Sequence, residues 1–257
     1  MTLSHVVLLF VAALVGGVLN AVAGGGSFLT FPALIFSGYP AIESNASSTV
    51  ALWPGAVASI GAYRQELGKA NRTLLILLTL CSLVGGGAGA QLLLHTPPKT
   101  FVHLIPFLLL LATLLFAFGK PLTAWWKGSH PSAATLSARS LAAMGIAQLV
   151  IAIYGGYFGG GIGILMLATL GLMGMEQIHE MNAVKTLLAA AINGVAVLTF
   201  VLAGIVLWAP ALLMIAGSLI GGYGGAAYAR RLNPRWVRMF VIAVGVVLTV
   251  YFFLQQA

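Results

Sequence analysis

The chain has 257 residues, of which 60% are hydrophobic and only 6% are charged, and its formal net charge is +8. Soluble globular domains carry about 25% charged residues, so this composition excludes a soluble protein and predicts one whose solvent is lipid. The surplus of positive charge does not predict a nucleic-acid partner. Most of the basic residues lie in short gaps between apolar runs, where they orient a membrane protein.

Apolar runs follow one another along the whole chain. The first five occupy residues 6–23, 27–38, 46–63, 73–94 and 102–118. A polar connector follows, and the next five occupy residues 141–158, 162–173, 181–206, 209–229 and 237–254. The first run has no Lys or Arg before it and no evident cleavage site, so we interpret it as a retained span and not as a signal peptide.

The second and seventh runs are shorter than the others. A helix of about 12 residues covers about 18 Å, which is too short for a hydrocarbon core of roughly 30 Å. These two runs therefore predict partial helices, and the sequence leaves open whether they span the membrane or re-enter it.

The two halves of the chain repeat each other at an offset of about 136 residues. The matched segments are Gly24-Gly25-Gly26 with Gly159-Gly160-Gly161, Asn45-Ala46 with Asn182-Ala183, Thr49 with Thr186, Leu83-Val84-Gly85-Gly86 with Leu219-Ile220-Gly221-Gly222, and Pro98-Lys99 with Pro234-Arg235. We therefore divide the chain into a first transmembrane repeat (1–119), an inter-repeat connector (120–138) and a second transmembrane repeat (139–257).

The basic residues are distributed differently in the two halves. The gap after the third run holds Arg64, Lys69 and Arg72, whereas the matching gap of the second half holds no charge. The gap before the last run holds four arginines, whereas its match in the first half holds only Lys99. Under the positive-inside rule this exchange predicts halves of opposite orientation. The expected fold is an all-α polytopic membrane protein of the inner (plasma) membrane, with two inverted repeats of about five helical segments each.

The two glycine triplets are candidate substrate-binding segments. Each follows one apolar run and precedes a partial helix, and glycine lets the backbone turn sharply there. Non-helical backbone at membrane depth is tolerated only inside protein or beside a water-filled cavity. The helix that follows would point its N–H groups and its positive dipole end at that cavity, which is typical of an anion site. The alternative is that the triplets only allow close helix packing. The candidate residues are Gly24, Gly25, Gly26, Gly159, Gly160 and Gly161.

Polar stripes begin the third and eighth runs at matched positions. Residues three and four apart share a helix face, so Asn45, Ser48 and Thr49 form one stripe. Asn182, Lys185 and Thr186 form the other. Hydroxyl and amide donors suit an oxyanion, while ordinary helix N-capping is the structural alternative.

Lys185 is the basic residue that lies well inside an apolar run. A central lysine costs about 2.5–3.5 kcal/mol on membrane-insertion scales. That cost favours a function, and the obvious one is a counter-charge for an anionic substrate. The alternatives are that Lys185 extends to the membrane interface or pairs with Glu176 or Glu180.

No catalytic or metal-binding motif is complete. The chain contains no aspartate, no nucleotide-binding P-loop and no nucleophile elbow, and His179-Glu180 lacks the second histidine of a zinc motif, because residue 183 is alanine. We therefore predict neither an enzyme nor a cofactor nor a metal site. Asn20 and Asn193 also lie in apolar surroundings, where each either contacts substrate or bonds to the backbone of a neighbouring helix.

Two segments carry a resemblance to a known family. The stretch from Asn20 through Gly24-Gly25-Gly26-Ser27-Phe28 and Phe31-Pro32 to Asn45-Ala46-Ser47 resembles the TauE/SafE family of sulfite and organosulfur-anion exporters. The stretch from Gly159 to Gly163 and from Asn182 to Thr186 is similar to the second repeat of that family. The resemblance implies an inner-membrane permease for anions such as sulfite, sulfoacetate or other sulfonates, driven by an ion gradient. Ile162 stands where the first repeat has Ser27.

The sequence thus leads to one main hypothesis and two alternatives. The main hypothesis is secondary transport of a small sulfur anion, bound between the repeats by Asn20, the glycine triplets, Ser27, the two polar stripes and Lys185. The first alternative is a passive channel, because the paired Asn-Ala segments resemble the half-helix starts of aquaporins. The second is a membrane enzyme. The expected partners are the anion, membrane lipid and a coupling ion, either proton or sodium, with a homodimer as an open alternative to a monomer.

Overall fold

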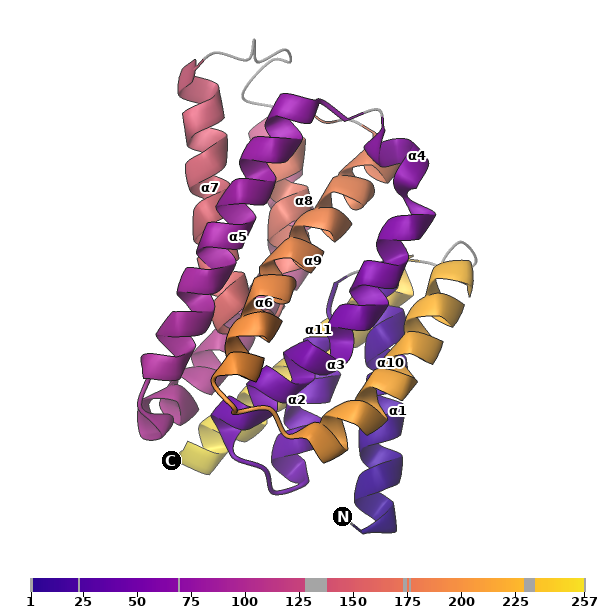
Figure 1. Ribbon diagram of the computed structural model, residues 1–257, viewed down its shortest axis with the longest axis vertical. Coiled ribbons are helices and arrows are strands. Elements are labelled where there is room, and N and C mark those ends of the chain that lie inside the picture. The colour runs from indigo at the N-terminus through magenta and orange to yellow at the C-terminus, as the bar shows by residue number, and fades with distance from the viewer. Residues whose placement is uncertain are drawn as a thin grey trace.

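A computed structural model describes residues 2–22, 24–68, 70–127, 138–172, 175, 177–228 and 234–256 of the chain. The regular elements in these ranges are α-helices, and most of them run along the long axis of the molecule (Figure 1). In chain order they are α1 (Leu3–Val22), α2 (Ser27–Phe36), α3 (Ala41–Ala62), α4 (Arg64–Leu67), α5 (Arg72–His95), α6 (Pro98–Lys127), α7 (Ala138–Tyr157), α8 (Ile162–Leu172), α9 (Ile178–Leu202), α10 (Trp208–Tyr228) and α11 (Pro234–Gln256).

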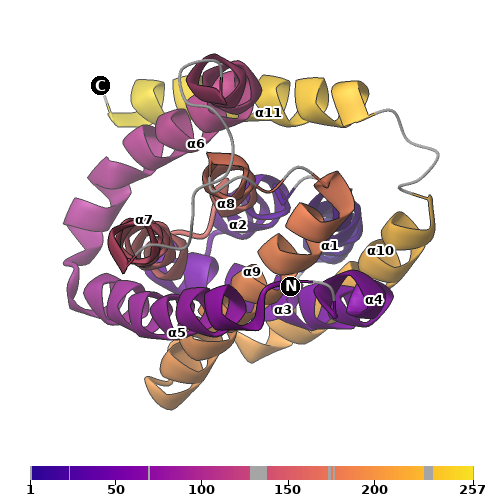
Figure 2. The ribbon, with the colours of Figure 1, turned by 90° about the horizontal axis from the view of Figure 1, so that it is seen from above.

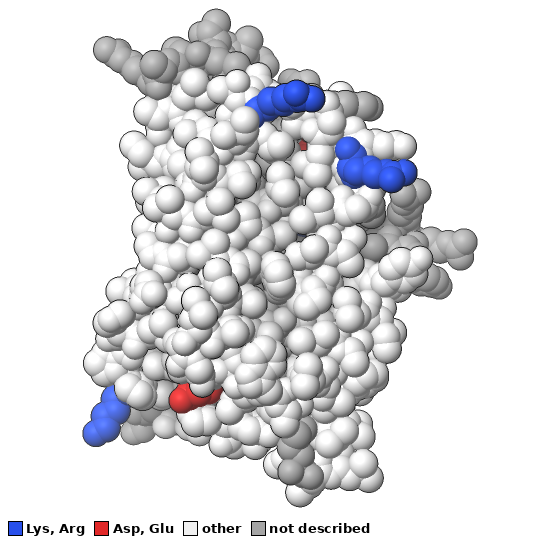
Figure 3. Space-filling model, in the orientation of Figure 1, with Lys and Arg blue, Asp and Glu red and all other residues white. Residues whose placement is uncertain are grey.

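The helices and the molecular surface are those of a polytopic membrane protein, as predicted. Segments long and apolar enough to cross a membrane are Leu3–Asn20, Arg72–His95, Pro98–Leu115 and His179–Leu202, and five shorter apolar helices accompany them. On the face shown in Figure 3, the charged side chains lie near the two ends, and the broad band between them is uncharged. Large apolar side chains such as Val84 and Val150 are exposed on this surface, where lipid would cover them.

The glycine triplets interrupt the helices where the sequence predicted a break. Gly24 and Gly159 have φ angles of 81° and 77°, which glycine adopts without the penalty that a Cβ brings. The chain reverses at each triplet, so that α1 packs against α2 and α7 packs against α8. With 10 and 11 residues, α2 and α8 are the expected partial helices, and Figure 2 shows both in the interior of the helix bundle.

Most contacts between two helices have a counterpart between the matching helices of the other half. If α1, α2, α3, α5 and α6 are matched with α7, α8, α9, α10 and α11, the pair α1–α10 corresponds to α7–α5, α3–α10 to α9–α5, and α2–α11 to α8–α6. The pairs α3–α9 and α6–α11 correspond to themselves. Trp53 Nε1 donates to the Ala190 carbonyl at 3.0 Å, and these positions are 137 residues apart. The packing therefore follows the sequence repeat.

The directions of matched helices can be followed in Figure 1. The α1 helix begins at the lower end of the molecule, whereas α7 begins at the upper end, and α3 and α9 also run in opposite directions. Both chain ends lie at the lower end. The orientation of the halves relative to a membrane stays a prediction.

Glycines bring the outer helices of the two halves together. A Cβ at Gly85 in α5 would lie 2.7 Å from the Leu149 carbonyl oxygen of α7, and a Cβ at Gly217 in α10 would lie 2.7 Å from the Phe10 carbonyl oxygen of α1. Backbones this close leave no room for a side chain, which is the small-residue packing of membrane helices. The glycines of α5 and α10 thus allow close packing of the helices.

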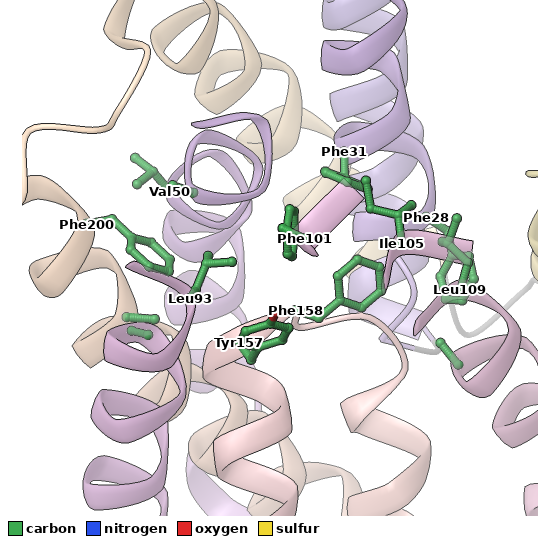
Figure 4. Close-up of a cluster of buried hydrophobic side chains, with 14 of the residues drawn as sticks. Phe28, Phe31, Val50, Leu93, Phe101, Ile105, Leu109, Tyr157, Phe158 and Phe200 are labelled. Carbon is green, nitrogen blue, oxygen red and sulfur yellow. The ribbon is translucent and has the colours of Figure 1, made fainter. Parts of the chain in front are cut away.

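An aromatic cluster fills part of the interior (Figure 4). Phe31 contacts the rings of Phe101 and Phe158 edge to face, with centroids 6.4 and 5.7 Å apart, and Phe101 contacts Tyr157 in the same way. The cluster includes residues next to the α5–α6 and α9–α10 turns, such as Leu93 and Val206. We call this group the aromatic seal: Phe28, Phe31, Phe101, Tyr157, Phe158 and Phe200.

The link between the halves is more helical than the sequence suggested. The predicted connector covers residues 120–138, but α6 continues to Lys127 and α7 begins at Ala138. Residues 128–137 lie outside the described part of the chain.

Candidate functional site

A cavity lies between the two glycine triplets. The space within it that the centre of a water molecule can reach is about 40 Å³. Its lining consists of Gly17, Asn20, Gly24, Ser27, Thr49, Leu52, Gly55, Ala56, Ser59, Gly159, Ile162, Gly163, Lys185, Thr186, Ala189 and Asn193.

Much of this lining comes as matched positions of the two repeats. The pairs are Gly24 with Gly159, Ser27 with Ile162, Thr49 with Thr186, Leu52 with Ala189, and Ala56 with Asn193. The cavity therefore lies at the interface between the repeats, where transporters built from repeats bind their substrates.

The two helix starts meet beside the cavity. A Cβ added to Gly24 would lie 3.3 Å from the Gly163 Cα, and one added to Gly159 would lie 3.9 Å from the Ser27 Oγ. The N–H groups of Ile162 and Gly163 donate to no backbone carbonyl within the described residues, as expected for the first turn of a helix. The α8 helix therefore presents free donors and its positive dipole end to the cavity.

Three hydroxyl groups in the lining are already committed as donors to their own helices. Thr49 Oγ1 donates to the Asn45 carbonyl at 3.0 Å, and Thr186 Oγ1 donates to the Asn182 carbonyl at 2.8 Å, which are matched bonds of the two repeats. Ser59 Oγ donates to the Gly55 carbonyl at 2.9 Å. A hydroxyl has one proton to donate, so these groups offer acceptor lone pairs to the cavity unless they rotate.

In the described lining, the uncommitted neutral donors are the Ser27 hydroxyl and the amide side chains of Asn20 and Asn193. Asn20 of α1 and Asn193 of α9 both line the cavity, are half-buried, and form no side-chain hydrogen bond within the described residues. Each carries two N–H donors as well as a carbonyl. They can therefore bind the oxygens of a small solute.

Lys185 provides the positive charge of the cavity. Its side chain is 4% exposed and lines the cavity. Within the described residues its ammonium forms neither a hydrogen bond nor an ion pair, and so it does not pair with Glu180, one of the expected alternative partners. Glu176, the other alternative, lies outside the described part of the chain. A buried ammonium without a counter-charge is costly, and an anion in the cavity would supply one.

Seven of the fourteen residues predicted for substrate binding line the cavity, and the other seven lie elsewhere. Asn45 Nδ2 donates at 3.0 Å to the carbonyl of Tyr157, the last residue of α7, and so satisfies a carbonyl that the helix leaves unpaired. Ser48 Oγ bonds to Thr30 Oγ1 at 2.6 Å. The half-buried Asn182 lies on α9 outside the lining. Gly25, Gly26, Gly160 and Gly161 belong to the backbone turns behind the cavity.

Nine lining residues were not among the fourteen predicted ones, although the sequence had named Asn193 as a possible substrate contact. Leu52, Ala56 and Ser59 continue the helix face that Thr49 begins, at the spacing of three and four residues that keeps side chains on one face. Following the stripe further along each helix would have found them and also Ala189 and Asn193. The remaining four are Gly17, Gly55, Ile162 and Gly163.

The residues present do not suggest a metal ion. Among the described residues, no three His, Cys, Asp or Glu side chains come together as a ligand group. The hydrogen-bond donors of the cavity suit an anion: they are an ammonium, two amides, the Ser27 hydroxyl and backbone N–H groups.

The chain matches one protein family and several curated relatives. The family described as "Sulfite exporter TauE/SafE" matches residues 9–252. A "Probable membrane transporter protein ORF9" of Sinorhizobium sp is 27% identical over 94% of this chain and 90% of its own length. A "Probable membrane transporter protein" of Haemophilus influenzae is 26% identical over 94% and 92%, and "Probable membrane transporter protein YfcA" of Escherichia coli K12 is 25% identical over 94% and 87%.

No solved structure matches the chain significantly. The family match covers both glycine triplets and every residue of the cavity lining. The apolar helices and the uncharged band of the surface agree with a multi-pass protein of the inner membrane. This chain therefore belongs to the sulfite exporter TauE/SafE family of membrane transporters.

Proposed function

We propose that this protein is a secondary transporter that exports a small sulfur-containing anion, such as sulfite or an organosulfonate, across the inner membrane. The observation that carries the proposal is the buried ammonium of Lys185, which faces the cavity without a counter-charge among the described residues. The family description supports the sulfur anion, and the names of the relatives support transport over enzymatic turnover.

The donor set of the cavity fits an oxyanion. Lys185, Asn20, Asn193 and the N–H groups at the start of α8 all donate hydrogen bonds, and the described lining contains no acidic residue. Charge-assisted hydrogen bonds are about twice as strong as neutral ones. A sulfite or sulfonate group offers three oxygens to these donors, whereas the ammonium end of a zwitterion such as taurine would find no carboxylate.

The shape of the cavity fits alternating access. Along α3 the lining reaches Ser59, close to the end of that helix at Ala62. The aromatic seal adjoins the lining at two points. Phe28 directly follows Ser27, and Phe158 directly precedes Gly159. We infer that the cavity opens toward the end of α3 and that the aromatic seal closes it on the other side.

The basic residues suggest which end faces the cytoplasm. Arg64 and Arg72 lie at the end toward which the cavity extends, and basic residues mark the cytoplasmic side. The substrate would therefore enter from the cytoplasm, as export requires. Rocking of one repeat against the other would open the aromatic seal and close the cytoplasmic side.

Flux measurements in proteoliposomes test the proposal. We expect the purified protein to transport ³⁵S-labelled sulfite with saturable kinetics, and we expect Lys185→Met to reduce the flux at least about tenfold, because a charge-assisted bond contributes about 1.5–3 kcal/mol. Lys99→Met removes an exposed lysine outside the cavity and should leave the flux unchanged. Equal flux in wild type and a folded Lys185→Met protein would refute the role of the ammonium.

The same experiment separates the transporter from a passive channel. A channel gives flux that does not saturate and never accumulates solute against a gradient. The coupling ion, either proton or sodium, is found by imposing each gradient in turn and asking which one drives accumulation. Light scattering of the purified protein in detergent distinguishes a monomer from a homodimer.

A further inference from the structure

The charge of the cavity changes sharply when the substrate leaves. Lys185 is the charged residue among the described lining, and it is 4% exposed. The hydroxyls of Thr49 and Thr186 line the cavity beside it, and these groups are neutral. With a monovalent anion bound, the site is neutral as a whole. With the anion gone, no described lining residue can neutralise the ammonium.

Alternating access forces the site through a closed state. Between the two open states the cavity is shut on both sides, and water that would hydrate the ammonium is excluded. An ion pair can pass through this state because its charges cancel. Without the anion, Lys185 either keeps its charge with neither hydration nor a partner, or releases its proton at neutral pH. Both routes cost free energy, so the closed empty state is raised in energy.

We propose that this protein works as an obligatory anion exchanger, in which the empty carrier cannot reorient and each exported anion is traded for another small anion from the far side. The inference rests on the proposed transport function and adds its mode. The counter-substrate belongs to the same chemical class, a compact oxyanion of equal charge, because it has to satisfy the same donors, Lys185, Asn20 and Asn193.

The size of the effect follows from the cost of an unpaired lysine inside a membrane protein. On insertion scales that cost corresponds to roughly a hundredfold in an equilibrium or a rate. The empty carrier should therefore return roughly a hundred times more slowly than the loaded one. Exchange should then dominate over net export whenever an anion is present on both sides.

The test measures efflux of ³⁵S-labelled sulfite from proteoliposomes loaded with it. Unlabelled sulfite outside should accelerate the efflux at least about tenfold relative to an outside solution of gluconate. Lys185→Met removes the charge that blocks the empty carrier, so its remaining flux should be equally fast with either solution. Lys185→Arg keeps the charge and should keep the acceleration, and Lys99→Met should behave as wild type.

A measurement on the wild type covers the case in which Lys185→Met transports nothing. Methanesulfonate carries a fixed single charge, so its one-for-one exchange moves no net charge. We expect this exchange to proceed at the same rate with and without a potassium diffusion potential set by valinomycin. A rate that changes severalfold with the potential would contradict neutral exchange.

The outcomes separate the two proposals. Protein-dependent sulfite flux that is equally fast with sulfite or gluconate outside would overturn obligatory exchange while leaving the transport function intact. The absence of protein-dependent flux of both sulfite and methanesulfonate under every condition would overturn the transport function itself, and the exchange mode with it.

Discussion

At the scale of single residues, Gly24 and Gly38 have the same backbone conformation in different surroundings. Their φ angles are 81° and 86°, in the left-handed region that costs a residue with a Cβ about 1–2 kcal/mol. A Cβ at Gly24 would also lie 3.3 Å from the Gly163 Cα at the cavity, whereas a Cβ at Gly38 would meet no atom within 4 Å. A substitution at Gly38 would therefore strain only the backbone, whereas a substitution at Gly24 would strain the backbone and also crowd the site.

We expect Gly24→Ala and Gly38→Ala each to lower the thermal unfolding temperature, because both place alanine at a positive φ angle. Only Gly24→Ala should also abolish sulfite flux, because its methyl group pushes the two helix starts apart. Thermal unfolding in detergent and flux in proteoliposomes measure the two effects. Full flux in Gly24→Ala would show that the approach of the triplets is not needed for transport.

The residues of the two polar stripes fall into two groups, those that line the cavity and those that bond to neighbouring helices. Thr49, Lys185 and Thr186 face the cavity, whereas Asn45 caps the end of α7 and Ser48 bonds to Thr30 of α2. An amide used to satisfy a backbone carbonyl at membrane depth stabilises the fold, because no water is present there to replace it. Neighbouring residues of one stripe thus serve structure and site separately.

At the scale of helices, glycine determines how closely α5 approaches the second repeat. A Cβ at Gly86 would lie 2.8 Å from the Ile192 carbonyl oxygen of α9. A Cβ added at Gly156 in α7 would in turn meet the backbone of Gly86 first. Dispersion forces and close packing hold membrane helices together where the hydrophobic effect cannot. The contact of α5 with α7 and α9 therefore depends on this glycine.

Gly86→Ala should destabilise the protein by about 1–3 kcal/mol, the usual cost of forcing extra atoms into a packed interior. The matched control is Gly61→Ala in α3, where an added Cβ meets nothing within 4 Å and alanine gains up to about 1 kcal/mol in helix propensity. Thermal unfolding in detergent should therefore shift down for the first and not down for the second. Equal shifts in the two variants would show that the contact is loose.

At the scale of the whole molecule, the matched packing of the halves predicts an inverted topology in the membrane. The gap between α3 and α5 contains Gln65, and the matching gap between α9 and α10 contains Ala203. Both residues are exposed. If the halves are inverted, these gaps lie on opposite sides, and the basic residues place the first one in the cytoplasm.

A membrane-impermeant maleimide tests this topology in intact cells. In a Cys81→Ser background, Ala203→Cys should be labelled from outside, and Gln65→Cys should be labelled only after the membrane is permeabilised. Lys99→Cys, at the same end as Ala203, should also be labelled from outside. Labelling of Gln65→Cys and Ala203→Cys from one and the same side would establish parallel halves and contradict the inverted repeat.

Local features of the sequence determined the class of the protein, the helices and their interruptions. The apolar runs at 27–38 and 162–173 became the short helices α2 and α8, because hydrophobic length and glycine act on the chain locally. The correspondence of the repeats was also visible, since matched motifs occur at a constant offset. The end of α6 at Lys127 was missed, because polar residues can extend a helix beyond the apolar run.

Only the tertiary structure decided which polar residues share the cavity. The rotation and depth of α3 are set by its packing against α9 and α10, which lie far away in the sequence. That packing aims Thr49 and Ser59 at the cavity and leaves Asn45 at the end of α7. It also surrounds Lys185 with neutral lining residues. The sequence showed that a lysine lies within an apolar run, but only the packing of distant helices leaves that lysine without a counter-charge in the described part of the chain.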